Sequence, residues 1–431
     1  MTERLYYADS HLTEFDARVL SVTPLDGGRA GVRLDRTAFY PTGGGQPTDT
    51  GTLDASRVVE CVDEEERGVL HIVEGDAPPS VGAQVRGRVD WTRRLDHIQQ
   101  HTGQHILSQA FVELFDAETR GFRMTEQAAE IDLTLREPSD ERIERAVSRA
   151  NEIIWQDRRV RIHQVTAEQA AQMPLRKDAT REGLLRVIEI EGFDISPCGG
   201  THATRTGEVG LIAVRSWERA KGMTRVEFVA GARALADYRR ANRTARDSAA
   251  LFSVARDDAP ASVARLLEEH KTLTRRVRAL EELEARVEAS ELLAEAVTEV
   301  DEPPAAGGNE AVRRGIDEGA HVGARERIVA RVLEGRDAES LKRLALALAA
   351  HPRTIALLGS RDGEQARLVF ARSADSAADM NALMRAACVE LDGRGGGRSE
   401  LAQGGGRAVD KLADVLDSAA RTLTPEPRQH I

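Results

Sequence analysis

Two short motifs, widely separated in the chain, constrain the fold more than any other feature, because both offer metal ligands. In H-T-G-Q-H, residues at i and i+4 of a helix share a face, so His101 and His105 can reach one ion. In C-G-G-T-H, two glycines allow the backbone to bring Cys198 and His202 to the same point. Three imidazoles and a thiolate suit tetrahedral zinc better than magnesium or calcium. The sequence therefore predicts one zinc ion per chain and a fold that joins the motifs.

The same four ligands leave the role of the metal open. A closed four-coordinate zinc site is usually structural, whereas catalytic zinc keeps one position for water. Either one ligand exchanges, or the metal mainly orders a pocket.

Composition indicates a multidomain globular protein. The 431 residues are enough for several domains, and no apolar run approaches the ~20 residues of a membrane span. We expect no secretory signal at the N-terminus and no disulfide framework from three cysteines, and therefore a cytoplasmic protein. A net charge of −11 argues against a generally basic nucleic-acid binder but allows local basic patches.

Hydrophobic periodicity predicts a multidomain α+β chain. Short alternating segments separated by turns predict a small β-barrel over residues 1–90. A helical period followed by mixed strands and helices predicts an α+β zinc domain over residues 91–231. A glycine-free, alanine-rich stretch predicts a helical hairpin or coiled coil over residues 232–300. After a Pro/Gly-rich linker, residues 301–431 are predicted to form a C-terminal α/β domain.

The stretch 232–300 contains a heptad repeat. Apolar side chains recur every seven residues at Leu266, Leu273, Leu280 and Val287, while the complementary positions become polar toward the end. Such a seam is covered either by a second copy of the chain or by a helix of the same chain. A homodimer and an intrachain hairpin therefore both remain open.

A glycine cluster near the N-terminus is a candidate ligand-binding segment. Gly43, Gly44 and Gly45 permit close approach of a ligand, and Gln46 and Asp49 are polar groups that such a loop can aim into a cleft. A hairpin turn is the structural alternative.

A second glycine run lies near the C-terminus. It is punctuated by Arg394, Arg398 and Arg407, and exposed amides beside guanidinium groups suit contact with phosphates. A flexible surface loop explains the composition equally well.

Taken together, these motifs resemble one family. R-R-L-D-H-I-Q-Q-H-T-G-Q-H-I-L-S-Q-A-F, C-G-G-T-H-A-T-R-T-G-E-V-G and F-Y-P-T-G-G-G-Q-P-T-D-T-G are similar to segments of alanyl-tRNA synthetase editing domains, and most of all to free-standing AlaX-type editing proteins. The C-terminal glycine run resembles the DHH-associated domain of the synthetases. The resemblance covers nearly the whole chain in order, which indicates the long form of the AlaX type. Because the chain starts directly in the glycine-motif domain, we expect no aminoacylation core.

The resemblance implies a zinc-dependent trans-editing hydrolase that deacylates tRNA for alanine charged with serine, and with glycine, in support of translational fidelity. The zinc ligands of the family match His101, His105, Cys198 and His202. The glycine motif and its glutamine match 43–45 and Gln46, for which we predict substrate binding and, for the glutamine, a catalytic role. A synthetase pocket for alanine cannot strongly exclude the smaller glycine or the hydroxyl of serine, so a second, hydrolytic site is needed.

One segment departs from the pattern that the resemblance leads us to expect. In G-F-R-M-T-E, Arg123 stands where a smaller residue is expected, and Thr125 is predicted to contact the hydroxyl of serine. The preference between serine and glycine stays open.

Three other functions share some of these features. A zinc peptidase usually carries H-E-x-x-H, but Thr102, Gly103 and Gln104 supply no carboxylate. A DHH-type phosphoesterase needs an aspartate-rich metal centre, and the acidic cluster 63–66 has no histidine partners in the sequence. A tRNA-binding module with structural zinc would bind mischarged tRNA without hydrolysing it.

Overall fold

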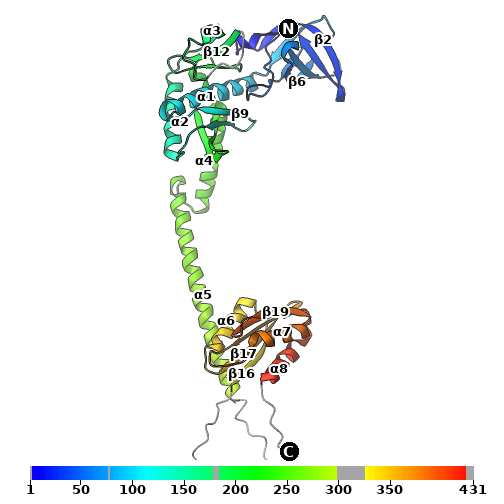
Figure 1. The fold of residues 1–431 in the computed structure, drawn as a ribbon, viewed down its shortest axis with the longest axis vertical. Helices are drawn as coiled ribbons and strands as arrows, with labels where there is room; N and C mark the ends of the chain where they lie inside the picture. Colours follow the sequence, from blue (N-terminus) through cyan, green and yellow to red (C-terminus); the bar gives the residue numbers. More distant parts are fainter. Residues whose placement is uncertain (1, 76–77, 178–183, 299–325, 424–431) are drawn as a thin grey trace, which may run out of the picture. The chain divides into compact units, whose positions relative to one another are not determined.

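The computed structural model describes residues 2–75, 78–177, 184–298 and 326–423 (Figure 1). These residues form two compact units, Met1–Asp257 and Asp258–Ile431. The predicted linker that follows residue 300 lies outside the described residues. Among the described helices, none is both long and apolar enough to cross a membrane.

The first unit begins with a closed barrel of six strands, which confirms the predicted N-terminal barrel. Alternate side chains point inward, as in the last strand, where every second residue is buried. The strands β7 (Val69–Glu74) and β8 (Gln84–Val89) follow the predicted alternation throughout, whereas β3 (Arg29–Leu34) has three consecutive buried residues and β5 (Gly51–Leu53) carries too few residues to show a period. The strands close in the order β2 (Glu14–Leu25), β3 (Arg29–Leu34), β7 (Val69–Glu74), β6 (Ser56–Asp63), β5 (Gly51–Leu53), β8 (Gln84–Val89). A two-stranded parallel pair, β1 (Glu3–Arg4) and β4 (Arg36–Thr37), lies outside this barrel.

Helix α1 (Trp91–Phe115) leaves the barrel and carries the first ligand motif. It begins after Asp90, whose carboxylate accepts hydrogen bonds from the backbone N–H groups of the first turn. It ends at Asp116, which adopts a left-handed conformation with φ of 52°. Most side chains from 97 to 111 are buried. The motif therefore lies inside the domain, away from bulk water.

Two antiparallel sheets pack with α1 and α2 (Asp140–Trp155) around one hydrophobic core. The four-stranded sheet has the order β14 (Ile212–Ala220), β15 (Met223–Ala230), β10 (Ala129–Leu133), β9 (Thr119–Met124). The three-stranded sheet has the order β11 (Val160–Thr166), β12 (Leu184–Ile190), β13 (Asp194–Pro197), and β13 ends directly before the second ligand motif. The short helix α3 (Ala167–Ala170) follows β11, and α4 (Gly231–Leu251) follows β15.

The second unit is an α/β domain with a long helix, α5 (Ala259–Thr298), at its start. Its mixed sheet pairs the first two strands in parallel and the remaining neighbours antiparallel. The strand order is β16 (Arg327–Glu334), β17 (Thr354–Asp362), β18 (Gln365–Arg372), β20 (Leu401–Gly406), β19 (Gly393–Gly397). The other helices are α6 (Ala338–Ala349), α7 (Met380–Glu390) and α8 (Leu412–Leu423). The predicted C-terminal α/β domain is confirmed.

The C-terminal glycine run is not the flexible loop that composition also allowed. Its two glycine triplets pair as the antiparallel strands β19 and β20. A Cβ atom placed on Gly395 or Gly404 would lie 2.6 or 2.4 Å from the Cys388 sulfur of α7. Glycine is therefore required for the close packing of α7 on this hairpin.

The heptad residues lie on α5, a single continuous helix of 40 residues. Leu266, Leu273 and Leu280 are 51, 58 and 63% exposed. Near the end of the helix, Ala289 and Leu293 are buried against α6 and its sheet. The pairing of the exposed part stays a prediction.

Candidate metal centre and adjoining cleft

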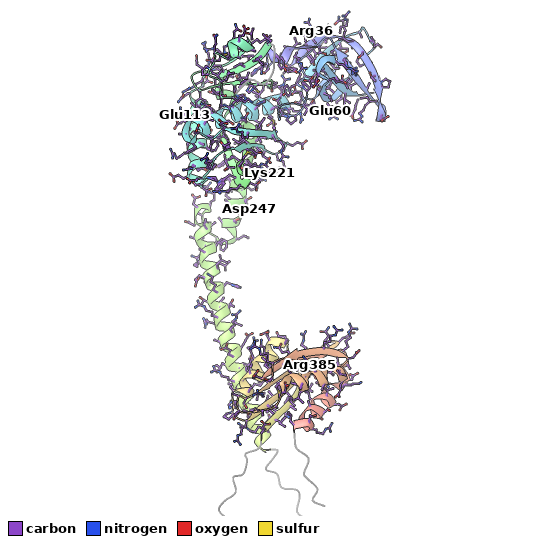
Figure 2. All side chains as sticks on the ribbon, in the orientation of Figure 1. Arg36, Glu60, Glu113, Lys221, Asp247 and Arg385 are labelled. Atoms are coloured by element: carbon purple, nitrogen blue, oxygen red, sulfur yellow. The ribbon has the colours of Figure 1, made fainter. Side chains whose placement is uncertain are left out.

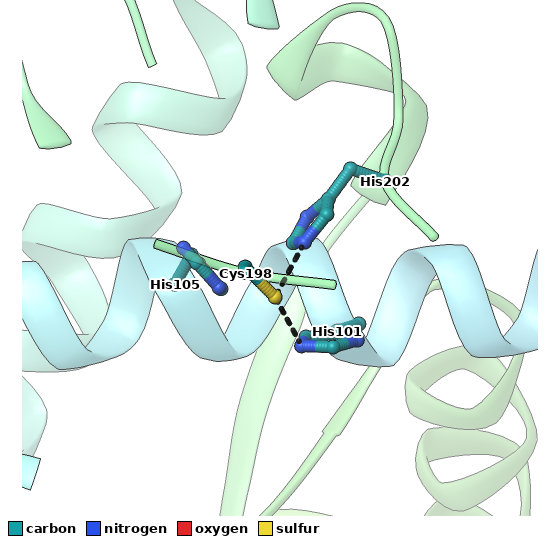
Figure 3. Close-up of side chains that lie close together, drawn as sticks. All are labelled: His101, His105, Cys198 and His202. Atoms are coloured by element: carbon teal, nitrogen blue, oxygen red, sulfur yellow. Dashed lines mark hydrogen bonds between the residues drawn. The ribbon is translucent and has the colours of Figure 1, made fainter. Parts of the chain in front are cut away.

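The four predicted ligands lie together (Figure 3). His101 and His105 come from successive turns of α1, and Cys198 and His202 from the segment that follows β13. Their ligand atoms all lie within 4.8 Å of one another. The sulfur of Cys198 is 3.3 Å from Nε2 of both His101 and His202. Imidazole and thiolate groups converging on one point in this way fit a tetrahedral zinc ion.

Gly200 of the second motif is needed for this approach. A Cβ atom on Gly200 would lie 2.1 Å from Cε1 of His101 and 3.0 Å from Oε1 of Gln46. No other residue fits there without displacing a ligand. The carbonyl groups of Cys198 and Gly200 both accept hydrogen bonds from the Arg186 guanidinium, at 2.8 and 2.9 Å, which fixes the course of the loop.

The surroundings prepare the ligands for a cation. Burial raises the pKa of the Cys198 thiol, but interactions with the neighbouring imidazoles of His101 and His202 and the hydrogen bonds of the cluster outweigh burial and hold that pKa well below its usual value. Burial lowers the pKa of His202 to about 3, so this imidazole is neutral near pH 7. A thiolate and a neutral imidazole are the forms that bind zinc. The donor set therefore fits the metal, and so do the protonation states of Cys198 and His202.

Polar partners hold the Nδ1 atoms of the histidines. Oε1 of Gln46 lies 2.7 Å from Nδ1 of His101, and Oδ2 of Asp194 lies 3.1 Å from Nδ1 of His105. Oγ1 of Thr102 lies 3.3 Å from Nδ1 of His202. Such partners orient the opposite ring nitrogen toward a metal.

A cleft of about 420 Å³ adjoins the cluster. His101 and Cys198 lie in its wall, beside the tyrosines Tyr7 and Tyr40. Its cationic residues are Arg4, Lys177 and Arg186. Since Arg4 is paired with Asp63 at 2.7 Å, Lys177 and Arg186 contribute most of its positive charge. The cleft therefore suits an anionic ligand with an aromatic part.

The glycine segment both forms a turn and borders this cleft. Gly43 and Gln46 exchange backbone hydrogen bonds of 3.0 and 2.9 Å, and Gly44 and Gly45 have φ of 58° and 83°. Gly43 and Gly44 line the cleft. Gln46 is 1% exposed and faces His101 instead of the open cleft.

Asp49, predicted to bind substrate, lies elsewhere. Its carboxylate is fully buried and pairs with the equally buried Arg94 at 2.5 Å. It also accepts a hydrogen bond of 2.7 Å from the backbone of Tyr40. In this position it joins the glycine segment to α1 and does not line the cleft.

Thr125 lies in the turn between β9 and β10. Its hydroxyl donates a hydrogen bond of 2.9 Å to the carbonyl of Ala128, and it is not among the residues that line the cleft. Arg123 is exposed and pairs with Glu130 at 2.8 Å.

The three predicted phosphate-binding arginines belong to the second unit. Arg394 is exposed on β19, Arg398 is exposed at the turn of the hairpin, and Arg407 is exposed just after β20. They share one glycine hairpin, so the structure brings them to the same element.

Sequence reasoning missed the partners of the ligands. Asp194 and Ser196 both contact Nδ1 of His105, the latter at 3.0 Å. Their positions in D-I-S-P-C offered a signal, because residues i and i+2 of a strand share a face. Arg186 offered none, since its role depends on tertiary contacts.

Comparisons with known protein families show the class of protein to which the chain is related. The family model described as "Threonyl and Alanyl tRNA synthetase second additional domain" matches residues 185–227, which include the second ligand motif. The model described as "tRNA synthetases class II (A)" matches residues 4–93, and the DHHA1 domain matches residues 326–424. The chain is thus built from domains that it shares with alanyl-tRNA synthetases.

Relatives narrow this class to one family. Alanyl-tRNA editing protein AlaX-L of Pyrococcus horikoshii is 32% identical over 433 residues, which cover 98% of each chain. Alanine–tRNA ligase of Pyrococcus abyssi is 32% identical over 435 residues, or 98% of this chain but 44% of the ligase. The chain therefore belongs to the AlaX family of alanyl-tRNA editing proteins and is a hydrolase. A solved C-Ala domain of alanyl-tRNA synthetase from Aquifex aeolicus is 30% identical, with a TM-score of 0.21, over 22% of this chain and 88% of that domain.

Proposed function

We propose that this protein hydrolyses the ester that joins serine, and also glycine, to the tRNA for alanine, and that zinc at His101, His105, Cys198 and His202 is required. The observation that carries the proposal is the convergence of these four ligands beside a cleft that is bordered by the glycine segment and has His101 and Cys198 in its wall. The similarity to a protein named for alanyl-tRNA editing supports the substrate. The cytoplasm, where charged tRNA is used, is the proposed location.

Hydrolysis of this ester requires few catalytic groups from the protein. An aminoacyl ester is labile, so the protein needs to position it, admit a water molecule and stabilise the oxyanion. Zinc, when bound, supplies a Lewis acid for the ester or the water, or an anchor for the substrate. Lys177 and Arg186 in the cleft favour the phosphate charge of a tRNA 3′ end.

Deacylation assays test the proposal. The full chain, with its zinc content measured, is mixed with alanine tRNA charged with serine, glycine or alanine. We expect release of serine and glycine to exceed both the uncatalysed rate and the release of alanine. Cys198→Ala should lose hydrolysis while keeping affinity for the tRNA. If a chain with one bound zinc binds mischarged tRNA without hydrolysing it, the protein is a binding module with structural zinc.

We further propose that the β19–β20 hairpin contacts the phosphates of the tRNA. Arg394, Arg398 and Arg407 are all exposed on this hairpin. Replacing all three by alanine should reduce the salt dependence of binding by up to about 3 in the log–log slope, since each phosphate contact contributes about 0.9. Arg385→Ala, on the exposed face of α7 (Figure 2), is the matched control. An unchanged slope in the triple variant would exclude the contact.

A homodimer through α5 is proposed as well. The exposed leucines at 266, 273 and 280 form a stripe with heptad spacing, which a second copy of the helix can cover. Sedimentation at several concentrations should show a dimer that Leu273→Asp dissociates. A monomer at all concentrations would favour the intrachain alternative.

A further inference from the structure

The loop between β4 and β5 of the barrel domain reaches into the metal centre. Gln46, from this loop, contacts the ligand His101 from α1 at 2.7 Å although 55 residues separate them in sequence. The same side chain donates a hydrogen bond of 2.9 Å to the Thr201 hydroxyl, inside the second ligand motif. One barrel residue therefore joins both ligand motifs.

The orientation of the Gln46 amide is fixed by its neighbours. The backbone N–H of Thr201 donates to Oε1 of Gln46 at 3.2 Å, and a backbone N–H can only donate. The atom facing His101 is therefore the oxygen, so Nδ1 of His101 must carry the proton. In a neutral imidazole with this tautomer, the lone pair lies on Nε2, the atom that faces Cys198.

Other N-terminal residues support the second motif. The Ser10 hydroxyl oxygen accepts a hydrogen bond of 3.1 Å from the backbone N–H of His202, and Ser10 is 2% exposed. Arg186, which holds the carbonyls of the Cys198 loop, donates from Nε to the carbonyl of Tyr7 at 3.0 Å. The N-terminal domain thus contacts the ligand segments at several buried points.

We propose that Gln46 is a positioning residue for the metal, and that metal binding and docking of the barrel stabilise each other. Gln46 selects the His101 tautomer that can bind zinc, and it does so only while the barrel is docked. By linkage, the factor by which docking raises metal affinity equals the factor by which metal favours docking. This inference rests on the proposed zinc site. In this proposal, Gln46 affects the metal by orienting His101 and does not contact the substrate.

The first experiment measures zinc affinity by chelator competition in the full chain. Gln46→Met keeps the length of the side chain but removes the acceptor, and should weaken zinc binding 10- to 100-fold. Gln46→Glu retains an acceptor for Nδ1 of His101 and should bind zinc within a few-fold of the wild type. Glu60→Met, on the exposed surface of the barrel (Figure 2), is the matched control and should bind zinc normally.

Cobalt substitution separates positioning from general destabilisation. The tetrahedral cobalt spectrum of the wild type should persist in Gln46→Glu and change in Gln46→Met. If Gln46 only packs the interface, Gln46→Met will lower the midpoint of thermal unfolding and leave the cobalt spectrum and the zinc affinity unchanged.

Hydrogen exchange of the wild-type chain tests the reciprocal effect without any substitution. Zinc should increase the protection of barrel amides near the 43–46 turn. Equal protection with and without zinc overturns the coupling, even if a variant fails to fold. If Gln46→Met binds zinc as tightly as the wild type, the positioning role of Gln46 is overturned, while the proposed zinc site remains intact. A wild type that binds no zinc overturns both.

Discussion

Oδ2 of Asp194 lies 3.1 Å from Nδ1 of His105, so a buried carboxylate contacts the imidazole of one proposed metal ligand. Oδ1 of the same group accepts a hydrogen bond of 2.7 Å from Arg176. Burial raises the pKa of Asp194, but the hydrogen bond to His105 and the charge of Arg176 outweigh it, and the net pKa lies below the usual value. The carboxylate is therefore ionised near pH 7 and can strengthen the imidazole as a ligand.

Asp194→Asn should weaken zinc binding 10- to 100-fold, because the neutral amide no longer polarises His105. Isothermal titration with zinc at pH 7 measures this. Asp132→Asn, which removes a 21% exposed carboxylate paired with Arg225 on the four-stranded sheet, is the control and should leave zinc affinity unchanged. Equal affinities in the two variants would show that the Asp194 contact does not tune the ligand.

Asp49→Ala should destabilise the protein by about 3–5 kcal/mol, because it leaves the Arg94 guanidinium buried without its counter-charge. Urea unfolding measures the change in the free energy of unfolding. Glu3→Gln, which breaks an ion pair with Arg36 whose side chains are 60 and 49% exposed, should cost no more than about 1 kcal/mol. If Asp49→Ala is folded and stable but loses substrate affinity, the residue binds substrate after all.

The pair formed by His11 and Glu208 should make stability depend on pH. Their side chains lie 2.7 Å apart. The hydrogen bond to Glu208 raises the pKa of His11 above 6.5. Burial raises the pKa of Glu208, but hydrogen bonds from His11 and Thr204 outweigh burial and lower it to about 2.

The sign of each effect follows from these shifts. His11 contributes stability that is complete below pH 6.5 and is lost as pH rises through its raised pKa. Glu208 contributes stability that is present above pH 4.5 and is lost as pH falls toward 2. The difference in melting temperature between the wild type and His11→Gln should therefore be largest between pH 4.5 and 6.5. A difference that does not vary with pH would contradict the pairing.

Gly404→Ala should destabilise the second unit by about 1–3 kcal/mol, because its Cβ would lie 2.4 Å from the Cys388 sulfur and 2.8 Å from the backbone of Gly395. Gly396→Ala, in the same hairpin, would meet Asn381 Oδ1 at 3.4 Å and should be nearly neutral. Thermal unfolding of the full chain compares them. Equal melting temperatures would show that α7 can move away from the hairpin at little cost.

The ligand cluster and most strands could be predicted from sequence because each rests on local spacing. His101 and His105 are one helical turn apart, and the barrel strand β8 alternates buried and exposed residues. The positions of Gln46 and Asp49 could not be predicted, since each is decided by a partner far along the chain. The strands of the C-terminal glycine run were missed because glycine carries no hydrophobic pattern. Their pairing depends on the neighbouring strand and helix.

The ligand motifs lie 97 residues apart, as measured from His101 to Cys198. An ion bound at the cluster would also lower the conformational entropy of the unfolded chain, because it would close one long loop as a disulfide bond does. In the chain-entropy treatment, closing a loop of about 100 residues is worth about 4.7 kcal/mol. The ion would then serve as a removable cross-link. The supply of metal would determine the stability of the chain against unfolding as well as its hydrolytic activity.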